Sequence, residues 1–236
     1  MEELKRKALE LGIELNEKQL YQFQKYYEML IEKNKVMNLT AITEWNEVVD
    51  KHFIDSISLV KAVDLSGEAS LLDLGCGAGF PGIPLKIVFP NLKIVLLDSL
   101  NKRILFLKEV IEELQLEQIE ALHGRAEDYA KKPEYREQFD YCVSRAVANL
   151  TTLSEYCLPY VKEGGSFISY KSGKVQEELK EIKKAMFLLG GKVEDVISFT
   201  LPETEIERDF VCIKKEKKTP KKYPRKAGMP SKEPLK

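Results

Sequence analysis

The feature that most constrains the fold is an apolar segment that runs directly into a cluster of glycines. Residues 70–74 have the composition of a β-strand, and Gly75, Gly77 and Gly79 follow at alternate positions. Glycine tolerates positive φ and has no Cβ to obstruct a ligand. A helix that begins after such a turn directs unpaired N–H groups and its positive dipole end toward whatever lies there. The stretch therefore predicts a loop that binds a nucleotide-type cofactor.

Short apolar runs alternate with helical patterns after this loop, which predicts βαβ units and a mostly parallel sheet. The last two strands have no helix between them, so we expect an antiparallel hairpin at one edge. This is an α/β fold with seven strands, in the layout of Rossmann-like class I S-adenosylmethionine-dependent methyltransferases. The expected strands are Ser70–Leu74, Lys93–Asp98, Gln118–His123, Phe139–Ser144, Ser166–Lys171, Val193–Thr200 and Asp209–Lys214; the expected helices are Ile83–Phe89, Lys102–Leu114, Glu127–Lys131, Leu150–Tyr160 and Val175–Leu189.

Changes in composition divide the chain into three parts. Residues 1–65 have helical periodicity and form an N-terminal extension that we expect to pack on the core, because its apolar stripe cannot be buried alone. Residues 66–214 form the predicted core domain. Residues 215–236 are rich in Lys and Pro and predict an extended basic tail. The net charge of −1 hides this polarity, since residues 214–236 hold ten Lys or Arg against two Glu.

Cysteine spacing and hydropathy exclude several protein classes. None of the four cysteines forms a C-x-x-C pair, which argues against a zinc site and a disulfide framework. The charged N-terminus is not followed by an apolar run typical of a signal peptide, and no stretch is long enough to span a membrane. We therefore expect a cytoplasmic protein, without metal or membrane attachment, that acts as a monomer.

The spacing of acidic residues around the glycines indicates the type of cofactor. Asp73, Gly75, Gly77 and Gly79 fit D-x-G-x-G-x-G better than the dinucleotide pattern G-x-G-x-x-G, and no G-K-[ST] phosphate loop is present. A carboxylate at Asp73 would suit an ammonium group and repel a pyrophosphate. Asp98 ends the next strand, 21 residues after Gly77, where it could accept hydrogen bonds from ribose hydroxyls of NAD or S-adenosylmethionine alike.

Two later strand ends complete the predicted ligand edge. Ala126 and Glu127, after the third strand, could contact an adenine, or could simply begin a helix. Arg145 ends the fourth strand, where neither an amino-methyltransferase N/D-P-P-[YF] motif nor a Pro-Cys nucleophile is present. A guanidinium there could bind phosphate or guanine acceptors, or be a surface arginine. His52 is expected to be a partly buried helix residue rather than a catalytic one.

The basic tail has the composition of an extended nucleic-acid-binding arm. Lys and Arg alternate with Tyr and Pro over residues 214–226, which favours contact with phosphates and a steep salt dependence. A merely solvated tail is the alternative. The candidate RNA-contacting residues are Arg145, Lys221, Lys222, Arg225 and Lys226.

The chain contains the blocks Asn38–Ile42, His52–Ser56, Leu72–Pro84, Leu97–Arg103, Ser144–Ala146 and Pro224–Gly228. Taken together, these blocks resemble the glucose-inhibited division protein B family (RsmG/GidB), the small-subunit ribosomal RNA guanine-N7 methyltransferases. Phe80 and the two prolines that follow the glycines are more specific than the glycines. The resemblance implies S-adenosylmethionine as cofactor, contacts to it from Gly75, Phe80, Ala126, Glu127 and Arg145, and a guanine in the decoding-region hairpin of 16S rRNA or the small subunit as substrate. One departure from the family pattern is Met229, which stands where the family usually has Thr.

The implied reaction needs no general base, because guanine N7 has a lone pair and no proton. We therefore assign no catalytic residue and expect Arg145 to position the substrate, away from N7 itself. Placing the reacting atoms in line is worth up to about 7–11 kcal/mol. Two other classes remain as alternatives at this point: an NAD-dependent oxidoreductase, and an RNA-binding protein that retains the loop without activity.

Overall fold

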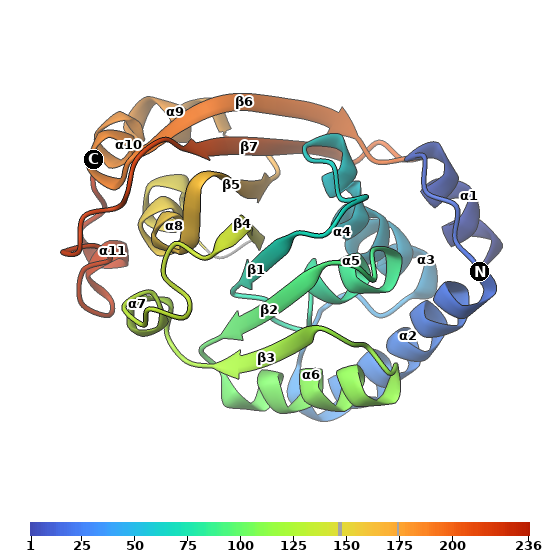
Figure 1. Ribbon diagram of the computed structural model, residues 1–236. Helices are drawn as coiled ribbons and strands as arrows, with labels where there is room; N and C mark the ends of the chain where they lie inside the picture. The colour runs from blue at the N-terminus through green and yellow to red at the C-terminus, as the bar shows by residue number, and fades with distance from the viewer. Residues whose placement is uncertain (146–147, 174) are drawn as a thin grey trace.

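The predicted strands assemble into one seven-stranded sheet at the centre of the computed structural model, which describes residues 1–145, 148–173 and 175–236 (Figure 1). The strand order is β3-β2-β1-β4-β5-β7-β6, so the Rossmann-like fold class is confirmed. The strands are β1 Ser70–Leu74, β2 Lys93–Asp98, β3 Ile119–His123, β4 Phe139–Arg145, β5 Val161–Lys171, β6 Gly191–Thr200 and β7 Glu207–Lys215.

Strands β1 to β5 are parallel, and the hairpin of β6 and β7 supplies the antiparallel edge. β7 lies between β5 and β6, because the chain passes the edge as β6 and returns to pair with β5. The chain order reverses between β1 and β4, whose pairing joins the two halves of the sheet. Ligands bind beyond the carboxyl ends of the strands at such a reversal.

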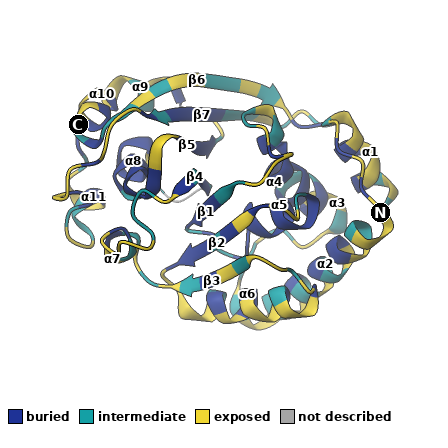
Figure 2. Ribbon diagram, viewed as in Figure 1, coloured by how far each residue is buried: buried dark blue, intermediate teal, exposed yellow. Residues whose placement is uncertain are grey.

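Helices cover both faces of the sheet and bury two apolar cores. The N-terminal helices share one face with α5 Gly82–Val88 and α6 Asn101–Glu113, while α8 Leu150–Cys157, α9 Val175–Glu181 and α10 Lys183–Leu189 cover the other (Figure 1). Figure 2 shows buried residues along the central strands and exposed ones on the outer side of α6. The single helix expected over residues 175–189 is divided at Ile182, which separates α9 from α10.

The N-terminal segment is helical and packs against the glycine loop. It contains α1 Glu2–Glu10, α2 Glu17–Met37, α3 Trp45–Val48, a π-helix Val49–Ile54, α4 Asp55–Ile57 and a 3-10 helix Ser58–Lys61. A capping box between Asn16 and Gln19 begins α2. The Tyr26 hydroxyl then donates to the Ala78 carbonyl at 2.6 Å, so α2 is attached directly to the loop after β1.

Residues 215–236 are folded onto the domain, in contrast to the expected extended tail. The buried ammonium of Lys215 donates to the Leu158 carbonyl and to the Thr219 hydroxyl at 2.7 Å. Arg136 donates to the carbonyls of Thr219 and Tyr223, and the chain then forms α11 Met229–Lys232. Internal polar partners for the Lys215 ammonium and for the Thr219 and Tyr223 carbonyls hold this segment against the domain.

Candidate functional site

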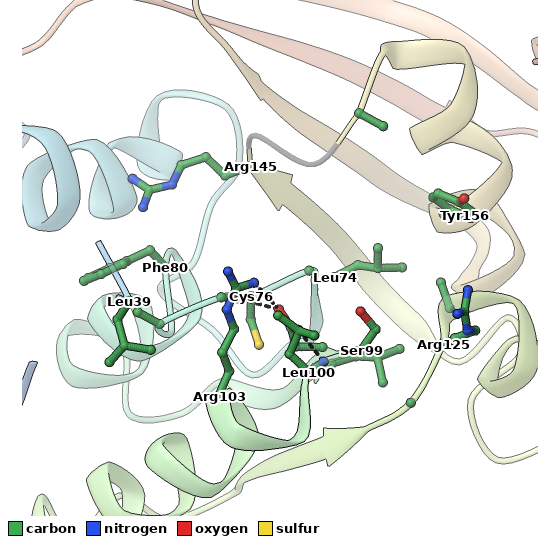
Figure 3. Close-up of a pocket in the computed structure, with 18 of the residues that line it drawn as sticks. Leu39, Leu74, Cys76, Phe80, Ser99, Leu100, Arg103, Arg125, Arg145 and Tyr156 are labelled. Atoms are coloured by element: carbon green, nitrogen blue, oxygen red, sulfur yellow. Dashed lines mark hydrogen bonds and ion pairs between the residues drawn. The ribbon is translucent and has the colours of Figure 1, made fainter. Parts of the chain in front are cut away.

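A cavity of about 610 Å³ opens at the carboxyl ends of β1, β2 and β4. We call it the main cavity. The close-up in Figure 3 shows Phe80, Leu39 and Arg145 toward one side of it, and Arg125 and Tyr156 toward the other. Leu100 and Arg103 lie between these groups, next to Cys76 of the glycine loop. Residues from every predicted ligand loop therefore meet in one place, together with residues that sequence reasoning did not select.

The glycine loop forms one wall of the main cavity. Gly75 and Gly77 have φ values of 74° and 59°, a conformation that L side chains rarely adopt. Apart from Gly77 and its chain neighbours, no atom of the described residues lies within 4 Å of the position that a Cβ on Gly77 would occupy, so this backbone faces open space. A Cβ on Gly79 would instead lie 2.7 Å from the Tyr26 hydroxyl oxygen. Gly77 thus leaves room for a ligand, whereas Gly79 leaves room for α2.

Asp98 ends β2 in the main cavity, as predicted, and its carboxylate organises the loops around it. Oδ2 accepts from the Gly77 amide at 2.9 Å, Oδ1 accepts from the Leu100 amide at 2.8 Å, and Arg103 lies 3.3 Å from Oδ2. Each carboxylate oxygen can accept more than one hydrogen bond. Asp98 can therefore hold the loop and still accept from a ribose hydroxyl.

Asp73 differs from the expectation, since its side chain is fully buried beneath the loop and is not part of the cavity wall. Oδ2 accepts from the Gly82 amide at 2.8 Å and thereby fixes the start of α5. Oδ1 has no hydrogen-bond partner among the described residues. Burial raises the pKa of Asp73 to about 7, against the opposing effects of the Gly82 amide and Arg145. Asp73 is therefore a structural residue beneath the loop.

Ala126 and Glu127 begin α7 Ala126–Tyr129 and line the main cavity, as expected for an adenine-binding loop. The Glu127 carboxylate is already used by the C-terminal segment, because Oε1 accepts from the Gly228 amide at 2.8 Å. Ser231 also reaches the cavity, where its hydroxyl lies 2.8 Å from that of Tyr156. The C-terminal segment therefore forms part of the cavity wall.

Arg145 extends from the end of β4 toward the N-terminal helices (Figure 3). Its guanidinium donates to the Asp55 carboxylate at 2.8 Å and to the Lys51 carbonyl at 3.0 Å, and lies 5.2 Å from the centre of the Phe80 ring. Asp55 is buried and accepts a second ion pair from Arg208 of β7 at 2.9 Å. Arg145 is therefore held in place by an internal carboxylate, which rules out a simple surface arginine.

His52 is the most informative residue that sequence reasoning passed over. Its ring stacks on Phe80 at 4.4 Å, in the wall of the main cavity. Nδ1 lies 3.0 Å from the Lys51 carbonyl and Nε2 lies 2.9 Å from the Thr40 hydroxyl, a pattern that suits a neutral ring with its proton on Nδ1. Burial, followed by the charge of Arg145, lowers the pKa of His52 to about 4.

The predicted RNA-contacting residues of the tail occupy two environments. Lys221, Lys222 and Lys226 are exposed. The Arg225 guanidinium instead forms a bidentate ion pair with the buried Glu155, with donor–acceptor distances of 2.9 and 2.7 Å, so its charge is used inside the protein. Ala146, the last residue of the Ser144–Ala146 motif, lies outside the described residues.

The strand order and the cavity at the chain reversal define a Rossmann-like α/β protein, and similar solved structures share this fold. TrmN from Thermus thermophilus matches with a TM-score of 0.52 and 15% identity, covering 68% of this chain and 48% of that one. MtNAS in complex with MTA and tNA matches with a TM-score of 0.55 and 16% identity, covering 81% of this chain and 73% of that one. At these identities the likeness shows the fold alone.

The model of the GidB family, described as rRNA small subunit methyltransferase G, matches residues 19–207. The chain therefore belongs to this family. The ribosomal RNA small subunit methyltransferase G of Lachnoclostridium phytofermentans is 59% identical, covering 95% of this chain and 93% of that protein. The protein of the same name from Staphylococcus saprophyticus is 55% identical, with the same coverage. The predicted family is thus confirmed.

Neither a membrane-spanning helix nor a metal-binding cluster is found in the part of the chain that the structure describes. Within residues 1–145, 148–173 and 175–236, no helix is long and apolar enough to cross a membrane. Over the same ranges, no cluster of three or more His, Cys, Asp or Glu side chains has an arrangement that could hold a metal ion.

Proposed function

We propose that this protein transfers a methyl group from S-adenosylmethionine to N7 of a guanine in 16S ribosomal RNA. The observation that carries the proposal is the match to rRNA small subunit methyltransferase G over nearly the whole chain. The arrangement of the site agrees with it, because the loop motifs that we assigned to a nucleoside cofactor surround one cavity.

The residues of the main cavity fit this cofactor. The open space beside Gly77 and the Asp98 carboxylate suit a ribose, and Ala126 and Glu127 suit an adenine edge. A volume of about 610 Å³ lies within the range of small-molecule sites. When bound, S-adenosylmethionine supplies an electrophilic methyl group, and its sulfur keeps the electron pair of the broken S–C bond. Gly75, Gly77, Phe80, Asp98, Ala126, Glu127 and Arg145 are the proposed cofactor-binding residues.

The charges around Phe80 suit a substrate atom that becomes positive during the reaction. Guanine N7 attacks with a lone pair and has no proton to lose, so no residue needs to act as a base. A bare cation beside this atom would oppose the reaction, but the Asp55 carboxylate offsets the charge of Arg145. His52 is neutral at physiological pH because its pKa lies near 4. Arg145 and His52 can thus position the base without strong repulsion.

Methyl transfer onto RNA tests this proposal directly. Labelled S-adenosylmethionine is incubated with purified protein and either naked 16S rRNA, small subunits or whole ribosomes. We expect label in the RNA at a single guanine, where reduction and aniline treatment cleave the chain as they do at N7-methylguanine. Label at another atom or in no RNA would refute the proposal. The comparison of the three substrates also identifies the assembly state that the enzyme accepts.

The exposed lysines of the C-terminal segment are proposed to contact RNA phosphates. Each contact to single-stranded RNA contributes a slope of about −0.7 to the dependence of log K on log salt. Replacing Lys221, Lys222 and Lys226 together by Gln should therefore reduce the slope of rRNA binding by about 2. The measurement is the dissociation constant for rRNA at salt concentrations between about 50 and 200 mM.

A matched triple variant provides the control for this charge removal. Lys93, Lys108 and Lys162 are also exposed, and Lys93 and Lys162 lie at the amino ends of β2 and β5, whereas the main cavity lies at the carboxyl ends of the strands. Their replacement by Gln removes the same charge and should leave the slope near that of the wild type. Equal slopes for the two triple variants would exclude the C-terminal lysines from the RNA interface.

A further inference from the structure

A second cavity of about 480 Å³ adjoins the main cavity, and we call it the side cavity. His52, Arg145 and Ala148 line both. The remaining walls of the side cavity come from the N-terminal segment, the end of β5, α9 and β7. Among the predicted cofactor-binding residues, Arg145 lines this space, and Gly75, Gly77, Phe80, Asp98, Ala126 and Glu127 line only the main cavity. His52 and Arg145 thus lie at the junction of the two cavities.

The side chains of the side cavity favour an anionic ligand. Four cations line it, Lys51, Arg145, Lys171 and Arg208, against two carboxylates, Asp55 and Glu178. His52 adds no charge at neutral pH because its pKa is about 4. A cleft lined by an excess of one charge concentrates ligands of the opposite charge. A nucleotide, with its phosphate, has the required sign and size.

Donors remain available in this cavity within the described part of the chain. The Lys171 ammonium has three N–H groups and donates to the Ala148 carbonyl at 3.2 Å and to Glu178 at 2.7 Å. The Arg208 guanidinium has five and donates to Asp55 and to the Glu207 carbonyl, both at 2.9 Å. Both side chains are more than four-fifths buried, so they are held in fixed positions. The free N–H groups can bind phosphate or carbonyl oxygens of a ligand.

The chemistry of guanine agrees with such an arrangement. Guanine presents O6 and N7 on its Hoogsteen edge, and the commonest specific contact is a guanidinium that binds both. N7 must stay free if it is the atom to be methylated. Recognition must then come from O6, from the Watson–Crick edge and from the phosphate. A site with separate cationic donors and carboxylate acceptors can provide all three.

We propose that the side cavity receives the target guanosine nucleotide, unstacked from the RNA, with Lys171 and Arg208 as donors to its oxygen atoms. This inference rests on the proposed function. Base recognition in RNA commonly uses such unstacked nucleotides. At the junction formed by His52 and Arg145, the base can direct N7 into the main cavity, where the methyl group would lie. The donors that recognise the nucleotide then lie on the side of this junction away from the main cavity.

Lys171→Gln is the test variant, because Lys171 lines only the side cavity. Methyl transfer to small subunits is measured at saturating cofactor, and cofactor affinity is measured separately by calorimetry. We expect KM for the subunits to rise about 10- to 100-fold, as the loss of a hydrogen bond from a charged donor would give. We expect kcat and the Kd for S-adenosylmethionine to stay within about twofold. Lys171→Arg, which restores a cationic donor, should recover most of the affinity.

Lys162→Gln is the control, since Lys162 lies at the opposite, amino end of the same strand and its replacement should not change KM. A wild-type enzyme that methylates RNA, combined with an unchanged KM for Lys171→Gln, would overturn the side-cavity assignment and leave the proposed function intact. A large loss of cofactor affinity in Lys171→Gln would also overturn it, because the residue would then belong to the cofactor site or to the fold. A wild-type protein that transfers no methyl group to RNA would refute the proposed function itself.

Discussion

The main cavity and the side cavity are built in different ways. The motif residues of the main cavity lie on loops that follow β1 to β4, and the N-terminal and C-terminal segments complete its wall. The side cavity is formed by side chains from segments far apart in the sequence, and the buried Asp55 joins two of them, Arg145 and Arg208. The comparison shows that the motif loops of a cofactor site can be recognised from local sequence, while the adjoining site depends on tertiary structure alone.

The largest expected effect is on the side-cavity wall. Asp55→Asn removes the buried carboxylate that forms ion pairs with both Arg145 and Arg208, whose side chains are largely buried. We expect the free energy of unfolding to fall by about 3–5 kcal/mol, because a buried charge is left without its partner. Urea unfolding measures this change. Asp64→Asn, at an exposed position, should cost less than about 0.5 kcal/mol. An equal effect of both variants would show that the ion pairs contribute little.

The next effect concerns Asp73, beneath the loop of the main cavity. Its pKa is raised from 3.8 to about 7, so the folded state binds more protons than the unfolded state between these values. The wild type should therefore lose stability as the pH rises from 4 to 7, by up to about 4 kcal/mol. Asp73→Asn has no carboxyl group at this position, so its stability lacks this pH dependence. Unfolding experiments at several pH values should show the variant gaining on the wild type as the pH rises, and a constant difference would contradict the assignment.

His52 should give the opposite pH dependence. Its pKa is lowered from 6.5 to about 4, so the unfolded state binds more protons in this range. The wild type should lose up to about 3 kcal/mol of stability as the pH falls from 6.5 to 4. His52→Gln keeps a polar side chain but does not titrate. Over the same unfolding series, its deficit relative to the wild type should shrink toward acidic pH. A deficit that grows would mean that the folded state holds His52 protonated.

The smallest effect is expected at the glycine loop. Gly77→Ala forces an L side chain into a positive φ, which costs about 1–2 kcal/mol, and directs a methyl group into the main cavity. We expect weaker binding of S-adenosylmethionine in calorimetry. Gly12→Ala is a matched control, because Gly12 has a φ of 76° and equally open surroundings but lies outside the main cavity. Similar destabilisation with weaker binding only for Gly77→Ala would separate strain from ligand contact.

The sequence predicted the main cavity better than the side cavity for a physical reason. Glycine spacing after a strand and an acidic residue at the end of the next strand are local signals, and Gly77 and Asp98 lie where these signals placed them. The ion pairs of Asp55 join residues about 90 and 153 positions apart along the chain, and no local pattern reports such a pairing. The helical periodicity around His52 correctly indicated a buried residue, but it gave no sign of the Phe80 ring beside it.

Asp73 and Arg225 show why the local sequence did not predict the surroundings of every charged side chain. Asp73 has a spacing suited to a ligand, yet its side chain lies under the loop and begins α5. Arg225 lies in a basic segment suited to RNA, yet Glu155, 70 residues earlier in the chain, holds its guanidinium. In both cases the composition was interpreted without knowledge of the buried partner. Charge in a sequence therefore indicates a surface contact only when no internal group of opposite charge is close.

The double ion pair of Asp55 constrains how this protein can change over generations. Loss of the carboxylate leaves two largely buried guanidiniums without this counter-charge, whereas loss of one arginine leaves Asp55 paired with the other. Replacement of Asp55 should thus be tolerated mainly when an arginine changes with it. In aligned relatives, a change at Asp55 is expected to be accompanied by a change at Arg145 or Arg208.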